Sequence, residues 1–241
     1  MQKSPLFAAA LALLALTGSA HADLKVTQKI RLDNPQLKAY LDTMTPQQRA
    51  QQMGRSDSLL SGLGPQTTTV YFSGVKTRAD VGTLTYLFNS QTHKCIVVVN
   101  RKKHTYTEQP YKAPVTSPFQ TTVKNAGPGK VIGGHPARHY LLTATTPSLP
   151  GTVIQGDIWA AQDLPTPPAM TGGGPFSALE SLLQKVKGYP LTATVVATGS
   201  PLGDTTFKSS VIAISKAALP VSVFAIPAGY TKTSTDTGSG M

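Results

Sequence analysis

Apolar and polar residues alternate with a period of two along most of the chain, which is typical of strands with one buried face. A first strand is predicted over about 26–32. The apolar spacing then changes to three and four residues over 37–44, which predicts a helix. Thr-Pro-Gln-Gln at 45–48 provides an N-cap, a first-turn proline and a capping-box partner, so a second short helix is expected up to about Met53.

Strand patterns dominate from residue 67 onward. Short runs separated by turn residues are predicted at 67–72, 75–81, 84–88, 95–99, 105–108, 121–124, 129–132, 137–144, 153–160, 191–197, 206–214 and 222–226. One helical spacing interrupts them at 176–186. Short strands at this spacing predict an antiparallel meander, so the expected fold is α+β and mostly β, with a single domain over 23–230. The tail 231–241 lacks an apolar pattern and is expected to be disordered.

The first 22 residues have the organisation of a secretory signal peptide. Lys3 provides the positive start, the uncharged apolar run Leu6–Leu16 follows, and small residues lead to Ala22. The apolar run is about half the roughly 20 residues that a membrane-spanning helix needs. We therefore expect cleavage after Ala22, a mature protein that begins at Asp23 and is periplasmic, and no transmembrane segment after cleavage.

The net charge says more about which molecules the protein associates with than about its fold. The chain has 22 Lys and Arg against 11 Asp and Glu, a net charge of +11, although charged residues make up only 14% of it. The basic character therefore comes from a shortage of acids, and it favours anionic surroundings such as lipid headgroups, cell-wall polymer or nucleic acid. The single cysteine, Cys95, cannot form an internal disulfide and lies in an apolar strand, which predicts a buried, inert thiol.

Searches for catalytic motifs find none. The sequence contains neither G-x-S-x-G nor H-E-x-x-H, and the glycine-rich stretch 127–131 lacks the Walker spacing and has Val131 in place of the Ser or Thr that binds magnesium. We therefore expect a protein that is not an enzyme and has no cofactor.

Metal and hydrolase sites would need residues that are distant in the sequence. His135 and His139 are four residues apart, about 13 Å on an extended strand, which is too far to share one metal. A site that includes His93 or His104 would depend on the fold, and acidic co-ligands are scarce, so no metal site is expected. For glycoside hydrolysis, Glu108 and Asp157 are the carboxylate pair to examine.

Four basic residues are expected to concentrate positive charge at one end of a predicted hairpin: Lys94, Arg101, Lys102 and Lys103. Short charge clusters usually serve solubility, and here they would protect the apolar strand 95–99 from aggregation. The alternative is a contact for the phosphate or carboxylate headgroup of a ligand. Nucleic acid is not an expected partner, because no stacking aromatic residues alternate with the basic ones.

Several short blocks occur in an order that resembles a known superfamily. They are Gly74–Arg78, His104–Glu108, Ile132–Tyr140, Gly156–Trp159 with Leu164-Pro165, Gly188–Leu191 and Pro227–Tyr230. Together they resemble the outer-membrane lipoprotein carrier (LolA-like) superfamily, and within it a proteobacterial periplasmic branch known as a domain of unknown function. Singly, the blocks are interpreted as turn chemistry, and Trp159 as the edge of the core.

The resemblance implies a curved antiparallel sheet, or half-barrel, with helices covering one face and acyl chains held on the concave side. It transfers no functional residues. We therefore expect a binding protein for an amphiphilic or lipid-like ligand of the cell envelope. Its candidate lining residues share strand faces by their spacing of two or four: Val70, Phe72, Leu84, Phe88, Ile96 and Val98.

Two other classes of function stay open. One is an envelope structural or protein-interaction module whose core is filled and which binds no small ligand but an envelope protein partner. The other, more distant, is a hydrolase with an unrecognised site. An open apolar groove of a few hundred cubic ångströms would favour the ligand-binding class, and a filled core would favour the module.

Overall fold

The computed structural model describes residues 23–45, 47–48, 64–92, 95–110, 119–147, 150–167, 182–200 and 203–233. The predicted signal peptide, most of the two predicted helices at 45–53 and 176–186, and the last eight residues lie outside the described residues. So do His93 and Lys94, and so do the side chains of Cys95 and Ile96. No helix in the described part of the chain is long and apolar enough to cross a membrane.

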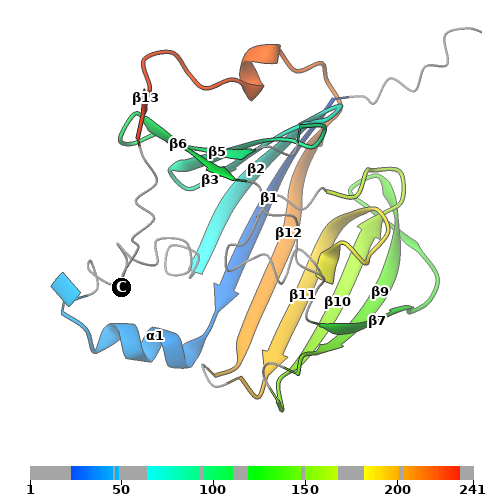
Figure 1. Ribbon diagram of the computed structural model, residues 1–241. Helices are drawn as coiled ribbons and strands as arrows, with labels where there is room; N and C mark the ends of the chain where they lie inside the picture. The colour runs from blue at the N-terminus through cyan, green and yellow to red at the C-terminus, as the bar shows by residue number, and fades with distance from the viewer. Residues whose placement is uncertain are drawn as a thin grey trace, which may run out of the picture.

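Strands dominate the fold, as the alternation predicts. Their bounds are β1 (Leu24–Asp33), β2 (Gly64–Ser73), β3 (Lys76–Val81), β4 (Leu84–Asn89), β5 (Cys95–Asn100), β6 (Thr105–Pro110), β7 (Gln120–Asn125), β8 (Lys130–Ile132), β9 (His135–Thr145), β10 (Val153–Ala161), β11 (Tyr189–Thr198), β12 (Thr205–Ser215) and β13 (Thr231–Lys232). Within the described ranges they form one sheet, in the order β13-β6-β5-β4-β3-β2-β1-β12-β11-β10-β9-β7, with β8 paired to β9 (Figure 1). The end strands β13 and β7 do not pair with each other, so the sheet is open.

Near the C-terminus one predicted strand is wrong, and the predicted tail is described only over residues 231–233. The strand predicted at 222–226 is instead the 3-10 helix η1 (Val221–Phe224), whose first bond runs from the Val223 N–H to the Pro220 carbonyl. Pro220 fixes its own φ before the turn, and a run this short has no clear period. The tail predicted to be disordered from residue 231 begins with β13, which pairs in parallel with β6. Backbone hydrogen bonds form this strand, so side-chain alternation could not predict it.

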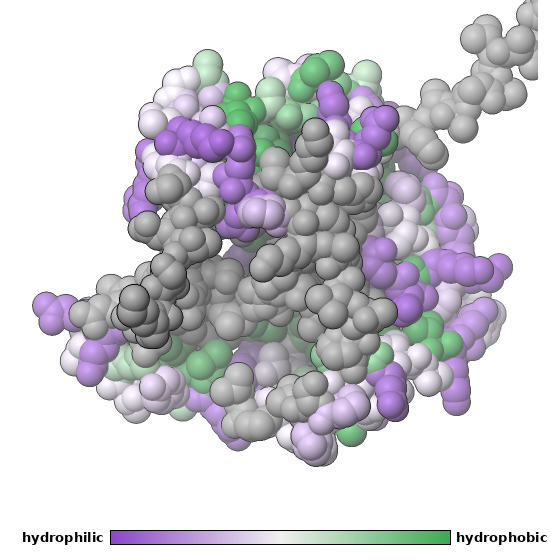
Figure 2. All heavy atoms as spheres, in the orientation of Figure 1, coloured by the Kyte–Doolittle hydropathy of each residue, from purple (hydrophilic) through white to green (hydrophobic). Residues whose placement is uncertain are grey.

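The helix predicted at 37–44 is confirmed as α1 (Pro35–Asp42). The Asn34 side chain caps it by accepting a hydrogen bond of 2.8 Å from the Leu37 N–H, and Asn34 Nδ2 donates to Thr205 Oγ1 on β12. Pro35 at the first helical position suits this start. The helix lies beyond the ends of β1 and β12 (Figure 1), buries none of its residues, and leaves hydrophobic surface in view (Figure 2). Helices that cover one face of the sheet are therefore not seen in the described ranges.

The sheet has two chemically different faces. We call the apolar face the one on which Val26, Val70 and Ala79 lie opposite one another on β1, β2 and β3, and the polar face the other. The apolar face holds two core clusters. The first comprises Leu24, Val26, Val70, Phe72, Ala79, Ala137, Ala161, Leu164, Tyr189 and Leu191, with Trp159 at its edge as interpreted from the sequence. The second comprises Tyr140, Leu142, Ala144, Ile154, Ile158, Ala160, Leu182, Val186, Ala193 and Val195.

The C-terminal segment crosses the polar face of β3. The Arg78 guanidinium donates a 3.0 Å hydrogen bond to the Val223 carbonyl, and the segment continues to β13 at the edge of β6 (Figure 1). On the same face, Leu87 and Val99 are only 7% and 1% exposed. Over β3 to β5 the polar face is therefore largely buried, whereas over β1 and β9 to β12 it carries exposed polar side chains.

Candidate functional site

The register of β2 to β5 brings five of the six predicted lining residues, all but Ile96, whose side chain is not described, onto the apolar face. Residues opposite each other in a ladder share a face. One row across the sheet runs through Val70, Ala79, Tyr86 and Val98, and a second through Phe72, Thr77, Phe88 and Ile96. A third contains Leu84. We call this strip of three rows on β2 to β5 the apolar strip.

Burial divides the five of these residues whose side chains are described. Val70, Phe72 and Phe88 are buried, with 7%, 9% and 5% exposure, while Leu84 and Val98 are half-buried. Val70 and Phe72 belong to the first core cluster, and the Phe72 ring meets the Tyr189 ring edge-on at 6.1 Å. These two residues therefore contribute to packing of the core, and Leu84 and Val98 are the accessible part of the strip.

Tyr86 is a strip residue that the sequence reasoning missed. It lies on β4 between Leu84 and Phe88 on the same face, opposite Val98. Its side chain is half-buried, and burial raises the pKa of its phenol above the ordinary value. The same alternation that selected positions 84 and 88 contains this signal.

Thr68 is a second missed residue, and it is chemically the most unusual. It shares the face of Val70 and Phe72, is 3% exposed, and its Oγ1 has no hydrogen-bond partner in the part of the chain that the structure describes. Leaving a buried hydroxyl unpaired costs about 1–3 kcal/mol, so such a group calls for an explanation. Thr85, on the other face of the sheet, is equally buried, and its hydroxyl donates to Asp80 at 2.5 Å.

Three residues of the predicted basic cluster lie in the described part of the chain. Arg101, Lys102 and Lys103 are exposed in the turn between β5 and β6, where Asn100 Oδ1 accepts hydrogen bonds from the Lys102 and Lys103 N–H groups at 3.1 and 3.0 Å. The Arg101 guanidinium donates to the Gly82 carbonyl. The six residues of β5 span about 20 Å, so this cluster is confined to the end of β5 that Arg101 follows. Lys94, which precedes the other end, lies outside the described residues.

This basic turn lies at one end of the apolar strip. Asn100 is the ladder partner of Leu84, and Thr68 and Leu84 are both partners of Val81. The unpaired hydroxyl and the basic turn therefore share the row of Leu84, while the rings of Phe72 and Phe88 lie at the opposite end. The strip is polar at one end and aromatic at the other.

The sheet does not bring the predicted carboxylate pair together, so that hypothesis is wrong. Glu108 on β6 pairs with Lys232 at 2.7 Å, and Asp157 on β10 pairs with His139 at 3.1 Å. Between β6 and β10 lie β5, β4, β3, β2, β1, β12 and β11. The reason is topological, because spacing along the chain does not determine strand order.

The described histidines have separate neighbours. His135 binds Asp163 at 2.8 Å, and His139 stacks on Trp159 with ring centroids 4.5 Å apart. His104 stacks on the Tyr230 ring at 5.1 Å. Among the residues that the structure describes, no group of three His, Cys, Asp or Glu side chains gathers as a metal site would require.

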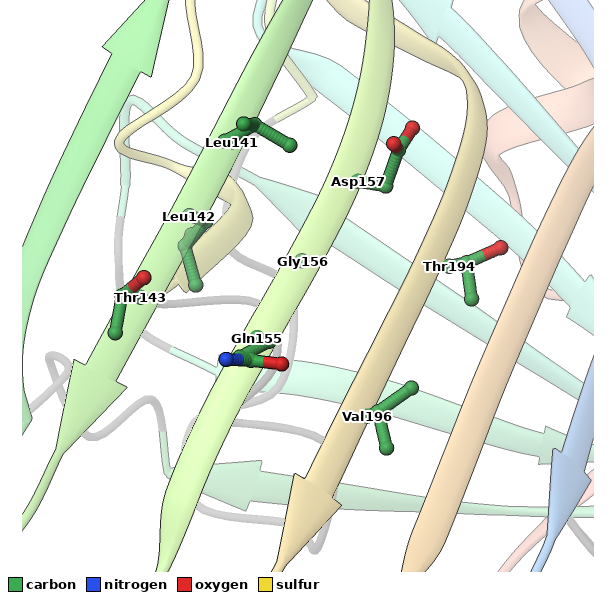
Figure 3. A pocket seen from close by; sticks show the side chains of 8 residues that line it. All are labelled: Leu141, Leu142, Thr143, Gln155, Gly156, Asp157, Thr194 and Val196. Carbon is green, nitrogen blue, oxygen red and sulfur yellow. The ribbon is translucent and has the colours of Figure 1, made fainter.

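A shallow hollow of about 400 Å³ opens on the polar face, where no site was predicted. Figure 3 shows side chains projecting from β9, β10 and β11 around it; its lining residues are Leu141, Leu142, Thr143, Gln155, Gly156, Asp157, Thr194 and Val196. Because Gly156 has no side chain, Leu142 and Val195 approach it on the apolar face, where a Cβ would lie 3.2 Å from Leu142 Cβ. A second hollow, of about 630 Å³, lies at the edge of β8 and β9 beside Lys130 and Arg138.

No protein-family model and no curated protein matches this chain. The solved structures that are similar to this chain include the following three. A structure of PNGF-II has 10% identity and a TM-score of 0.39 over 89% of this chain, which spans only 31% of that protein. A LolA superfamily protein from Nitrosomonas europaea has 8% identity and a TM-score of 0.32, over 84% of this chain and 90% of its own. A domain described as a putative outer membrane lipoprotein-sorting protein, from Vibrio parahaemolyticus, has 8% identity and a TM-score of 0.33, over 84% and 89%. The predicted resemblance to the LolA superfamily is therefore confirmed as a distant similarity, and at TM-scores this low it carries over neither a function nor a site residue.

Proposed function

We propose that this protein is a periplasmic, non-enzymatic binding protein that holds an amphiphilic, lipid-like ligand on the apolar strip. The observation that carries the proposal is the buried hydroxyl of Thr68, which has no hydrogen-bond partner among the described residues and lies at one end of a face that is otherwise apolar. A ligand with one polar end and one apolar end would hydrogen-bond to this hydroxyl and also cover the apolar face. Helices over this face, and the curvature of a half-barrel, belong to the proposal as well.

The two ends of the strip suggest how such a ligand lies. Its polar end would hydrogen-bond to Thr68 Oγ1 in the row of Leu84, near the basic turn. Its hydrocarbon would run along β4 and β5 over the half-buried Leu84 and Val98 toward Phe88. The side chains on β3 between them are small, Thr77 and Ala79, and leave the larger ones of β2 and β4 to flank the chain.

Hydrocarbon burial provides enough free energy for such binding. A chain of about ten methylenes at ~0.8 kcal/mol each gives ~8 kcal/mol on transfer from water. Lost translational freedom and ordering of side chains offset at least 4 kcal/mol of this, so micromolar affinity would require the polar end to contribute as well. The hydrogen bond to Thr68 and charge attraction to Lys102 and Lys103 are the available contributions, and the latter would weaken with salt.

One observation favours the second candidate, an envelope interaction module without a small ligand. Val70 and Phe72, two of the predicted lining residues, already pack against Tyr189 and Leu191 in the first core cluster. If the rest of the strip is filled in the same way, the face is core and the partner is a protein.

Uptake of a fluorescent fatty acid by the delipidated protein distinguishes the two candidates. The chain offers a matched pair of variants, because Val97 and Val98 are adjacent, half-buried valines on opposite faces of β5. Saturable uptake that Val98→Asn weakens at least about fivefold, the loss of ~1 kcal/mol of apolar contact, and Val97→Asn leaves unchanged supports the ligand site. No uptake by the wild type, or equal effects of the two variants, supports the module.

A further inference from the structure

Basic side chains gather on the polar face where β1 and β12 meet. Lys29 and Arg31 on β1 and Lys208 on β12 are exposed, and we call these three residues the basic patch. Arg31 is the direct ladder partner of Lys208, and Lys29 lies two residues before Arg31 on the same face. Side chains that face each other across a ladder have Cβ atoms about 5 Å apart, and like charges there repel.

Among the three residues of the patch, only Arg31 is neutralised by a carboxylate of the same face in the described structure. Asp33, the nearest along β1, is held by Arg31 at 2.7 Å. Asp157 pairs with His139 and Asp80 with Arg78. Within the described ranges, neither Lys29 nor Lys208 has a carboxylate at ion-pair distance, so an anionic partner would meet uncompensated positive charge.

Hydroxyl and aliphatic side chains surround the patch. Lys29 lies between Ser210 on β12 and Thr67 on β2. Thr27 pairs with Ala213 and Gln28 with Val211, so Ile212 is an extra, bulged residue of β12, and its side chain is 52% exposed. Leu141, at the hollow on the same face, is 46% exposed. Basic residues that attract lipid phosphates, combined with exposed aliphatic side chains, are typical of surfaces that bind membrane interfaces.

The chemistry of this face suits a bilayer better than a nucleic acid. Single-stranded nucleic acids stack their bases on open aromatic faces. Trp159 stacks on His139, and Lys130 Nζ lies 3.8 Å from its ring centroid. Tyr71 has both Lys25 and Arg78 over its ring. The rings of Trp159 and Tyr71 are thus occupied by neighbouring side chains.

We propose that the polar face of β1 and β12 docks on the surface of a bilayer that contains anionic lipids, with the basic patch against headgroup phosphates and Ile212 in the interface. This docking goes beyond the proposed ligand site, because it uses the opposite face of the sheet. A ligand could therefore enter or leave the apolar strip while the protein is docked.

Sedimentation with vesicles tests the docking on the mature protein. Vesicles of phosphatidylcholine alone are compared with vesicles that also contain phosphatidylglycerol, at about 0.1 M and about 1 M salt, where screening lengths are about 10 and 3 Å. Each basic residue near an anionic surface contributes about fivefold in affinity, so Lys29→Gln, Arg31→Gln and Lys208→Gln together should weaken binding about 100-fold. The control triple Lys38→Gln, Lys185→Gln and Lys187→Gln removes the same charge from other exposed positions.

The docking site is supported if the wild type binds the anionic vesicles in a salt-sensitive way, the patch triple loses this binding and the control triple keeps it. Circular dichroism must show that both triple variants are folded. Equal losses in the two triples, or no binding by the wild type, would overturn the docking site. If the protein instead binds heparin or single-stranded RNA through the basic patch and does not bind vesicles, the bilayer is not the partner. Val98→Asn should bind vesicles like the wild type, so failure of the ligand site and failure of the docking site give different results.

Discussion

Thr68→Val is expected to stabilise the protein when no ligand is bound. Valine has nearly the shape of threonine and replaces the hydroxyl by a methyl group. Because Thr68 is 3% exposed and its hydroxyl is unpaired in the described structure, the substitution removes a desolvation cost of about 1–3 kcal/mol. We expect the free energy of unfolding of the delipidated protein to rise by about 1–2 kcal/mol.

Thr85→Val is the matched control, and its expected effect has the opposite sign. Thr85 is also 3% exposed, but its hydroxyl donates to the Asp80 carboxylate at 2.5 Å. Hydrogen bonds to charged groups contribute about 1.5–3 kcal/mol, so we expect the free energy of unfolding to fall by about that amount.

Urea unfolding followed by the fluorescence of Trp159, the single tryptophan, measures both changes. For a domain of this size, 1 kcal/mol corresponds to about 2–4 °C in Tm. If Thr68→Val destabilises the delipidated protein as Thr85→Val does, the Thr68 hydroxyl is bonded within the protein itself. The main support for a polar ligand end at this position would then be lost.

Three further predictions concern packing of the core, the loss of stability at acidic pH and removal of the signal peptide. Ile158→Ala, at a fully buried position, should cost about 2–5 kcal/mol in urea unfolding, whereas Ile212→Ala should stay within about 0.5 kcal/mol. Burial raises the pKa of Asp163, but the hydrogen bond and charge of His135, a backbone hydrogen bond and the hydrogen bond from Lys216 together lower it to below its ordinary 3.8. The stabilising contribution of its carboxylate is therefore present above about pH 3.8 and lost as pH falls through the folded pKa. In Asp163→Asn, the free energy of unfolding should depend less on pH in that range. Intact-mass analysis of exported protein should show Asp23 as its first residue; an intact Met1 in membrane fractions would contradict this.

Strand positions were predictable from the sequence because they depend on local alternation. The strand predicted at 153–160 is β10, Val153–Ala161, and the one at 206–214 is β12, Thr205–Ser215. Their arrangement was not predictable, because the pairing of β1 with β12 joins residues as far apart in the sequence as Lys25 and Ser215. The alternation of side chains contains no information about which strand lies beside which.

The site divides in the same way. It could be predicted that Val70 shares a face with Phe72, Phe88 with Leu84, and Val98 with Ile96, because alternate residues of one strand lie on the same face. The register of the ladders then joins these positions across the strands. Thr68 has the same parity as Val70, but as a polar residue it does not count toward an apolar pattern. The basic patch could not be predicted from the sequence, because Arg31 and Lys208 become neighbours only through the register of β1 and β12.

Photocrosslinking is the most direct test of ligand binding on the apolar strip. Two fatty acids, with a diazirine near the methyl end or near the carboxyl end, are bound to the delipidated protein, irradiated and located by peptide mass spectrometry. The account predicts labelling of β2, β4 and β5 that excess unlabelled fatty acid prevents, near Phe88 with the first probe and near Leu84 with the second. Labelling of the polar-face hollow around Gln155, or labelling that excess fatty acid does not prevent, would contradict it.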